Sequence, residues 1–242
     1  MRYFDKIYEQ LRRAEETQSP VIAQAADRLA DILANDGLIY VFGATHAGIM
    51  AQELFYRAGG LVPIVPIFGP GLTTDVRPIT LTSELERKSG YAELLLNASG
   101  LTARDALIVH SVSGRNTVAI EMAEGARARG ALVIALTSVT YSAAVTSRHP
   151  RGVKLMDAAD IVIDNCGVIG DAVVQLEGLP QAVGPTSTVV GAALLNALVV
   201  EIVERLLQRG IEPSVFLSAN LDRGDAHNQR LLDKYRGRLN YL

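Results

Sequence analysis

Residues 106–137 constrain the fold of this chain more than any other stretch. Residues 106–110 form an apolar run typical of a strand buried on both faces, and residues 117–129 then change to helical spacing. Gly130 ends the predicted helix, and a second apolar run follows at residues 131–136. A strand, a loop, a helix and a strand within one sheet predict a parallel pair with a right-handed crossover.

The loop between the first predicted strand and the helix is rich in hydroxyl and amide groups. It consists of Ser111, Val112, Ser113, Gly114, Arg115 and Asn116. Hydroxyls and backbone N–H groups at the positive end of a helix, at the carboxyl edge of a parallel sheet, suit an anion such as a sugar phosphate. Ser and Asn also begin many helices purely as caps, so a capping role is the alternative. The loop has neither a Walker ending nor a GxGxxG pattern.

This loop resembles the phosphate-binding loop of the SIS (sugar isomerase) domain family, whose motif is close to Ser-x-Ser-Gly-x-Thr/Asn after a buried strand. The resemblance covers most of the chain, through ELFYRAGG, LERKSGYAE, TSRHP, ADIVIDNCG, GPTST and SANLDRGDAHN. These segments look like those of single-domain, uncharacterised-type SIS proteins. That group is similar to the N-acetylmuramic acid 6-phosphate etherases and the N-acetylglucosamine 6-phosphate dehydratases. The expected fold is therefore a three-layer αβα, flavodoxin-like doubly wound domain with a five-stranded parallel sheet.

Composition narrows the class of protein. A chain of 242 residues with 49% hydrophobic and 20% charged residues predicts one domain with a sizeable core. A net charge of −3 without a basic cluster argues against nucleic-acid binding. The beginning of the chain has no apolar signal core, and the uncharged apolar stretch at residues 189–200 is too short to span a bilayer. We expect a cytoplasmic protein that does not interact with membranes.

The first 35 residues are expected to form a helical pair. Apolar residues occur at helical spacing on both sides of Pro20, which is predicted to begin the second helix. The pair, residues 1–35, would pack on the core or on a partner subunit, and residues 36–242 would form the SIS phosphosugar-binding domain with a C-terminal tail. A helix-turn-helix reader of DNA is disfavoured because a basic recognition helix is absent.

A second polar loop follows the predicted strand at residues 38–42. In the SIS pattern this loop is close to Gly-x-Gly-x-Ser, but here Thr45 takes the place of the second glycine and Ala47 that of the serine. Either Thr45 or His46 replaces the missing ligand contact, or the chain binds a different or weaker ligand. His46 could equally be a structural hydrogen-bonding residue.

A third polar cluster precedes the long predicted helix at residues 189–209. Ser187 and Thr188 are either helix caps or phosphate contacts, and the resemblance implies the latter. The helix is apolar nearly all round as far as Val200, which predicts burial within the domain or at a dimer interface. Arg148 and His149 could add charge-assisted contacts to a phosphate, although exposed loop charges are common.

The predicted acid/base groups come mainly from the resemblance. Ser83 and Glu86 have the spacing of a capping box at the start of a helix reaching about residue 97, which gives Glu86 a structural alternative. In the related etherases and isomerases a glutamate near the start of this helix removes the proton from sugar C2, which implies Glu86, with Glu53 as a weaker candidate. His227 is the candidate for a second acid/base group, the alternative being a flexible polar tail.

Together these features predict a phosphosugar-binding SIS protein acting on an amino-sugar 6-phosphate. Glu86 would abstract the C2 proton, leading to isomerisation or to elimination, while Glu53 or His227 assists the leaving oxygen. We expect a homodimer or homotetramer, no cofactor and no metal. A non-catalytic sugar-phosphate sensor is the alternative, which Ala47 slightly favours. Asp171 is a possible hydrogen-bond partner for sugar hydroxyls.

Overall fold

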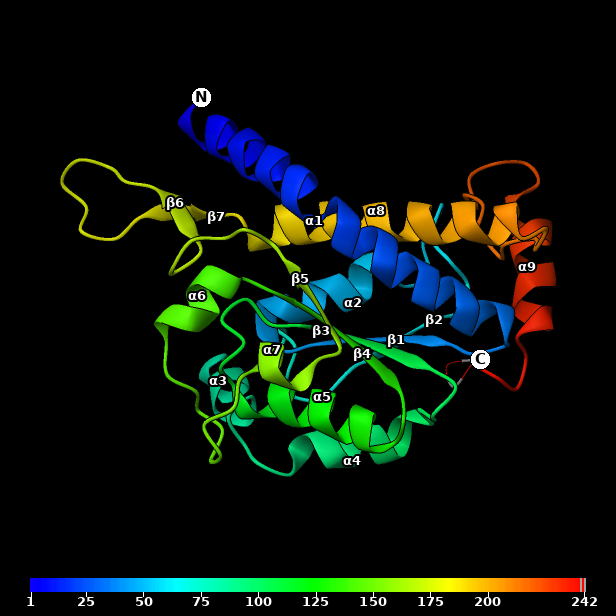
Figure 1. Cartoon of the computed structure of the whole chain (residues 1–242), viewed down its shortest axis with the longest axis horizontal. Coiled ribbons are helices and arrows are strands. Elements are labelled where there is room, and N and C mark those ends of the chain that lie inside the picture. Colours follow the sequence, from blue (N-terminus) through cyan, green and yellow to red (C-terminus); the bar gives the residue numbers. More distant parts are fainter. Residues whose placement is uncertain (240, 242) are drawn as a thin grey trace.

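Five parallel strands form the middle layer of the molecule in the computed structural model, which describes residues 1–239 and 241 (Figure 1). The order of the strands across the sheet is β2-β1-β3-β4-β5, which confirms the predicted doubly wound fold. Their bounds are β1 Ile39–Gly43, β2 Ile64–Ile67, β3 Ala106–His110, β4 Leu132–Thr137 and β5 Ile161–Asp164. The proline-containing strand β2 lies at an edge, as expected for a strand that lacks an N–H donor.

Helices cover both faces of this sheet. Alternate strand residues point to opposite faces, so Ile39 and Val41 belong to one core cluster while Tyr40 and Phe42 belong to the other. The first core is covered by α1 (Arg2–Ala34), α2 (Ile49–Leu54) and α8 (Ser187–Gln208), and the second by α4 (Tyr91–Ser99), α5 (Thr117–Ala128) and α7 (Leu155–Ala158). Figure 1 shows these two sets of helices on opposite sides of the strands.

The expected N-terminal helical pair is one continuous helix. Helix α1 contains Pro20 in its interior, and its buried residues continue on both sides of that proline, among them Gln18 and Ile22. The helix is held along its length by α8, with which it runs parallel, because Asp27 pairs with Arg205 and Asp31 with Arg209. Long-range packing therefore overrides the local tendency of Pro20 to end a helix.

The single helix predicted at residues 83–97 is two helices. Helix α3 spans Thr80–Leu85, and α4 begins only after Gly90, whose φ of 82° requires a left-handed backbone. Ser83 lies inside α3, and Glu86 is the residue that ends it, so the capping box is wrong. Glu86 therefore lies at the carbonyl end of a helix and not at its N–H end.

The C-terminal half adds a small hairpin and a terminal helix. The hairpin of β6 (Ala172–Val174) and β7 (Val183–Pro185) precedes α8 and projects from the domain beside the start of α1 (Figure 1). Helix α9 spans Gly224–Lys234. Asn240 and Leu242 of the predicted C-terminal tail lie outside the described residues. No helix of the described chain combines the length and apolar character that crossing a membrane would require.

Candidate functional site

Three polar segments gather at the carboxyl edge of the sheet. The register pairs Gly43 at the end of β1 with His110 at the end of β3, so the loops after these two strands are neighbours. The third segment is the start of α8, because a side chain at Gly191 would lie 3.9 Å from Nε2 of His110. In Figure 1 the start of α8, together with α2 and α6 (Val139–Ala144), lies at this end of the molecule. The ends of β1 and β3 and the first turns of α8 are thus neighbours.

The loop after β1 has a tightly constrained backbone. It forms a short 3-10 helix, η1 (Thr45–Gly48), in which Thr45 has a φ of 58° and donates its N–H to the carbonyl oxygen of Leu72 at 2.6 Å. A β-branched residue at positive φ is strained, and such strain gathers at functional sites. Nδ1 of buried His110 lies 3.1 Å from the carbonyl oxygen of Ala47 and ties the loop to β3. The side chains of Thr45 and His46 form no hydrogen bond with another described residue.

The loop after β3 presents unpaired hydroxyl groups and a positioned arginine. Ser111 and Ser113 are half-buried, and their hydroxyls have no partner among the described residues. Gly114 has a φ of 58°, and a Cβ there would lie 3.1 Å from Oγ of Ser142, so the tight turn requires glycine. Arg115 donates to Oγ1 of Thr146 at 3.2 Å, while its buried Nε has no partner in the described part of the chain.

Asn116 connects a carboxylate with an arginine. Its Oδ1 accepts a hydrogen bond from Nη1 of Arg148 at 2.8 Å, and its side chain is also hydrogen-bonded to the carboxyl group of Glu86. Because a carboxylate only accepts, the Asn116 amide donates to Glu86. The backbone carbonyl of Glu86 accepts from the N–H of Val118 at 3.1 Å, which holds Glu86 against the beginning of α5.

The pKa of Glu86 lies above its ordinary value of 4.5. Burial is the main cause, and it outweighs the Asn116 hydrogen bond and the charges of Arg87 and Arg148, which all lower the pKa. A helix start favours an ionised carboxylate, but Glu86 ends α3, where the carbonyl end of the helix disfavours negative charge. A carboxyl group with a raised pKa, held beside an amide and an arginine, is suited to general acid/base chemistry.

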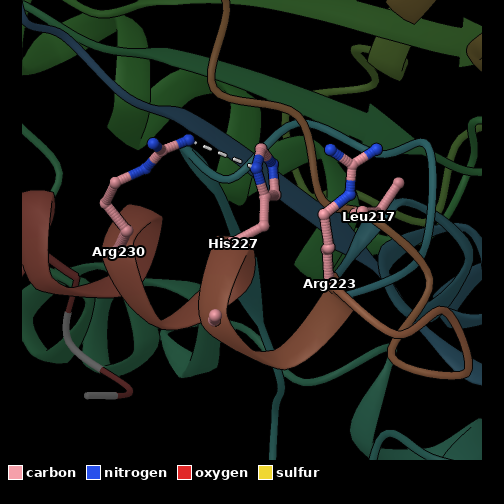
Figure 2. A pocket seen from close by; sticks show the side chains of 5 residues that line it. Leu217, Arg223, His227 and Arg230 are labelled. Atoms are coloured by element: carbon pink, nitrogen blue, oxygen red, sulfur yellow. Dashed lines mark hydrogen bonds between the residues drawn. The ribbon is translucent and has the colours of Figure 1, made fainter.

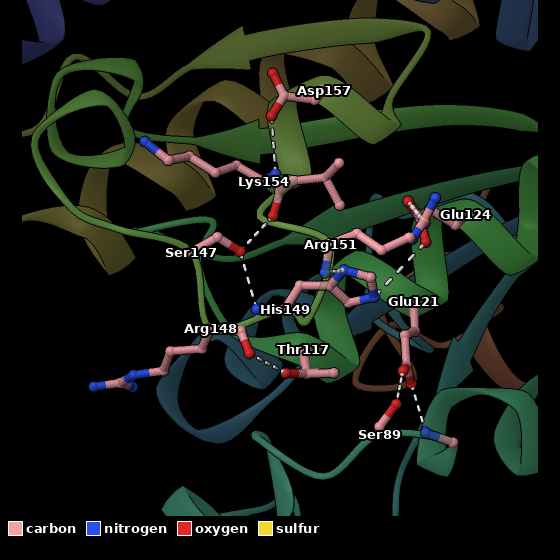
Figure 3. Close-up of polar contacts among 12 residues, drawn as sticks. Ser89, Thr117, Glu121, Glu124, Ser147, Arg148, His149, Arg151, Lys154 and Asp157 are labelled. Atoms are coloured by element: carbon pink, nitrogen blue, oxygen red, sulfur yellow. Dashed lines mark hydrogen bonds and ion pairs between the residues drawn. The ribbon is translucent and has the colours of Figure 1, made fainter.

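Arg148 is positioned by a loop that packs on α5 (Figure 3). Its carbonyl accepts from Oγ1 of Thr117 at 3.1 Å, and its N–H donates to the carbonyl of Arg115 at 2.8 Å. Glu124 of the same helix forms an ion pair with Arg151. The Arg148 side chain extends away from these contacts, and burial, followed by the charges of Arg115 and Arg87, lowers the pKa of its guanidinium group.

His149 has a different environment from Arg148. It is buried, its Nε2 lies 4.0 Å from Glu124 on α5, and its Nδ1 accepts from the N–H of Arg151 at 3.3 Å, so it holds the loop against α5. Its backbone N–H donates to Oγ of Ser147 at 3.0 Å, as Figure 3 shows. The structure thus separates two neighbouring residues that the sequence suggested together: Arg148 contacts the site, and His149 stabilises the loop.

Asp171 occupies the beginning of α8. Its carboxylate accepts from the backbone N–H of Ser187 at 2.8 Å, from that of Thr186 at 3.1 Å and from the Ser187 hydroxyl at 2.6 Å. A carboxylate at a helix N-terminus satisfies orphan N–H groups and interacts favourably with the helix dipole. Ser187 is therefore already paired, whereas half-buried Thr188 has no side-chain partner among the described residues. This role of Asp171 follows no sequence pattern, because sixteen residues separate it from Ser187.

Glu53 and His227 interact with residues other than Glu86. Glu53 forms an ion pair with Arg57 and accepts from Nδ2 of Asn196 at 2.9 Å, so its carboxylate links α2 to α8. His227 belongs to α9, which lies at the opposite end of the molecule from α3 and α6 (Figure 1). Within the described chain, no hydrogen bond or ion pair joins either residue to Glu86.

Comparison with known proteins agrees with this fold. The SIS domain family matches residues 2–138. A UPF0309 protein of Shouchella clausii is 45% identical over 240 residues, which cover 99% of this chain and 98% of that protein. A phosphoheptose isomerase from Francisella tularensis has a TM-score of 0.56 at 17% identity, covering 83% of this chain and 94% of the other. The Vibrio vulnificus NanR protein complexed with ManNAc-6P has a TM-score of 0.50 at 15% identity, covering 96% and 67%. The chain therefore belongs to the SIS domain family and is closely similar to the UPF0309 proteins.

Proposed function

We propose that this protein binds a phosphorylated amino sugar at the carboxyl edge of its sheet, and that Glu86 removes the C2 proton of the open-chain sugar. The observation that carries the proposal is the raised pKa of Glu86 beside Asn116 and Arg148. Isomerisation and elimination both begin with abstraction of a proton next to a carbonyl, so one such carboxylate serves either reaction.

The loop after β3 is the proposed phosphate site. The hydroxyls of Ser111 and Ser113 and the Nε of Arg115 have no partner in the part of the chain that the structure describes, and a phosphate monoester would accept from these donors. Arg148 adds positive charge on the side of Glu86. Thr45, His46 and Thr188 are proposed sugar contacts, while Ser187 could join them only by exchanging its bond to Asp171.

The other two acid/base candidates, Glu53 and His227, have less support than Glu86. The Glu53 carboxylate is engaged by Arg57 and Asn196, and His227 lies at the far end of the molecule (Figure 1). These positions do not favour a role for Glu53 or His227 in assisting the leaving oxygen of a sugar bound to the same chain. Asn116, which donates to Glu86, and Arg148, which holds Asn116, are better placed to orient the base.

Replacement of the base tests the proposal. In Glu86→Gln we expect C2–deuterium exchange to fall by ~10²–10⁴, because the amide cannot accept the proton. Wild type and variant would be incubated with hexosamine and hexulose phosphates in D₂O and followed by NMR. Glu84→Gln is the matched control, since Glu84 is exposed on the same short helix. A folded Glu86→Gln variant with near-normal exchange would refute the role of Glu86.

A non-catalytic sensor is the second candidate. Ala47 provides no hydroxyl where the SIS pattern has a serine, and one structural neighbour is the NanR protein complexed with ManNAc-6P. A sensor would bind a sugar phosphate with saturation but leave it unchanged. The same NMR experiment separates the two, because deuterium at C2 or a new product means an enzyme.

A further inference from the structure

A basic pocket lies on one side of α9, away from the carboxyl edge of the sheet. Its volume is about 490 Å³, and it is lined by Leu217, Arg223, Ala226, His227 and Arg230. The three basic residues follow one another at i, i+4 and i+7, which places them on the same helix face. In Figure 2 their side chains project from one side of α9 toward the segment that carries Leu217.

The arginines of this pocket form no ion pair among the described residues, although Asp222 and Asp225 lie next to Arg223 in the sequence. The guanidinium group of Arg230 donates instead to Nδ1 of His227, at 3.3 Å. Other arginines of the same region are neutralised, since Arg236 pairs with Asp233 and Arg238 with Asp36. The pocket thus brings together two guanidinium groups that are available to an anion from outside the chain.

The histidine between the arginines has a fixed orientation. Its Nε2 lies 3.0 Å from the carbonyl oxygen of Val215, to which it donates, so its Nδ1 accepts from Arg230. This bond holds the Arg230 guanidinium over the pocket, as Figure 2 shows. Arg223 precedes α9 directly, so the positive end of an eleven-residue helix adds to the field at this point.

From this arrangement we propose that the pocket of Arg223, His227 and Arg230 binds the phosphoryl group of a small phosphate compound, as a second anion site. Two planar guanidinium groups match phosphate oxygens with paired N–H donors. Leu217 and Ala226 provide an apolar wall for the remainder of such a compound. The site goes beyond the proposed sugar-phosphate function and does not depend on it, because α9 lies at the other end of the molecule from α3 and α6 (Figure 1).

The histidines allow the two sites to be observed separately. The chain has four histidines, of which His227 lies in the pocket of α9 and His46 in the loop after β1. Imidazole NMR signals would be followed during titration of the full chain with inorganic phosphate, against a chloride control of equal ionic strength. We expect a saturable shift of the His227 signal. In Arg223→Gln/Arg230→Gln the dissociation constant for this shift should rise about tenfold or more, with the response of His46 unchanged.

The controls decide between this site and its alternatives. Arg236→Gln removes a charge just beyond the same helix but lines no part of the pocket, so it should leave the His227 titration unaltered. A His227 signal that does not respond to phosphate, or that responds equally in the double variant, overturns the second site. If the double variant instead changes the oligomer mass while phosphate has no effect on His227, the pocket is a subunit interface and the proposal is wrong. A failure at His46 alone would count against the sugar-phosphate site and not against this one.

Discussion

The carboxyl group of Glu86 is subject to opposing influences. Burial raises its pKa, while the Asn116 hydrogen bond and the charges of Arg87 and Arg148 lower it, and burial dominates. At an exposed helix start the same residue would be an ordinary ionised cap. Its chemistry therefore depends on where α3 ends and on what covers the side chain.

The raised pKa makes a prediction about stability. A carboxyl group whose pKa is higher in the folded chain than in the unfolded chain binds its proton more tightly when folded. Its stabilising contribution is present below the unfolded pKa and is lost as the pH rises through the folded pKa, above 4.5. Glu86→Gln stays neutral, so its free energy of unfolding should improve relative to wild type between about pH 4 and about pH 7. Urea unfolding of both proteins across this range measures the difference, and a constant difference would contradict the assignment.

At the scale of single elements, the start of α8 depends on a distant residue. Asp171 has a φ of 68° and offers its carboxylate to two backbone N–H groups and to the Ser187 hydroxyl. The hairpin of β6 and β7 separates this residue from the helix that it caps. The hairpin and α8 are therefore coupled through one side chain.

Removing this cap should weaken the fold measurably. We expect Asp171→Ala to lower the free energy of unfolding by about 1 kcal/mol, because N–H groups at the start of α8 lose their acceptor. Urea unfolding at fixed protein concentration measures the loss. Asp222→Ala is the control, since Asp222 is exposed and its side chain forms no hydrogen bond or ion pair with another described residue. Equal stability of the two variants would show that water replaces the carboxylate without cost.

Helix α1 shows how far an element can depart from its local pattern. Pro20 removes one backbone donor, and by local rules it begins a new helix. Hydroxyl groups of neighbouring residues bond to carbonyls of the preceding turn, Thr17 to Arg13 at 2.8 Å and Ser19 to Glu15 at 2.5 Å. Because these bonds do not replace the donor that Pro20 lacks, it is the parallel packing on α8 that keeps the helix continuous.

At the scale of the whole molecule, α8 is apolar on its outer side as well as its inner one. Leu195 and Leu198 are buried in the core, but Val200 is 56% exposed and Leu207 58%. The helix was expected to be buried or to lie at a dimer interface, and the exposed apolar residues of α8 support the latter as a proposal. We therefore expect a homodimer or homotetramer that uses this helix.

A charge on the outer side of α8 tests the expected assembly. Val200→Glu should reduce the mass measured by light scattering, because a carboxylate would be desolvated in the interface. Leu94→Glu is the matched control, since Leu94 is 65% exposed on α4, which covers the other face of the sheet. A wild-type monomer, or an equal change in both variants, would show that α8 does not form the interface.

Local patterns predicted most of the framework and part of the site. The apolar runs of β3 and β4, the spacing of α5 and the proline of β2 are local patterns, because burial and a missing N–H donor act within one element. The resemblance likewise indicated the loop after β3 and Glu86. What the pattern could not show was the hydrogen bond that Asn116 shares with Arg148, since 32 residues separate them.

The sequence by itself determined that this chain has buried parallel strands followed by polar loops, because hydrophobic periodicity and loop composition are local properties, and the resemblance to the SIS family implied the doubly wound sheet. Only the tertiary structure decided that α1 continues through Pro20, that Glu86 ends a helix, that Asp171 caps α8 and that His227 lies in a separate basic pocket. These four outcomes depend on contacts between distant segments. In each case burial and long-range hydrogen bonds outweigh the local structural preference. This outcome cannot be inferred from a short stretch of neighbouring residues.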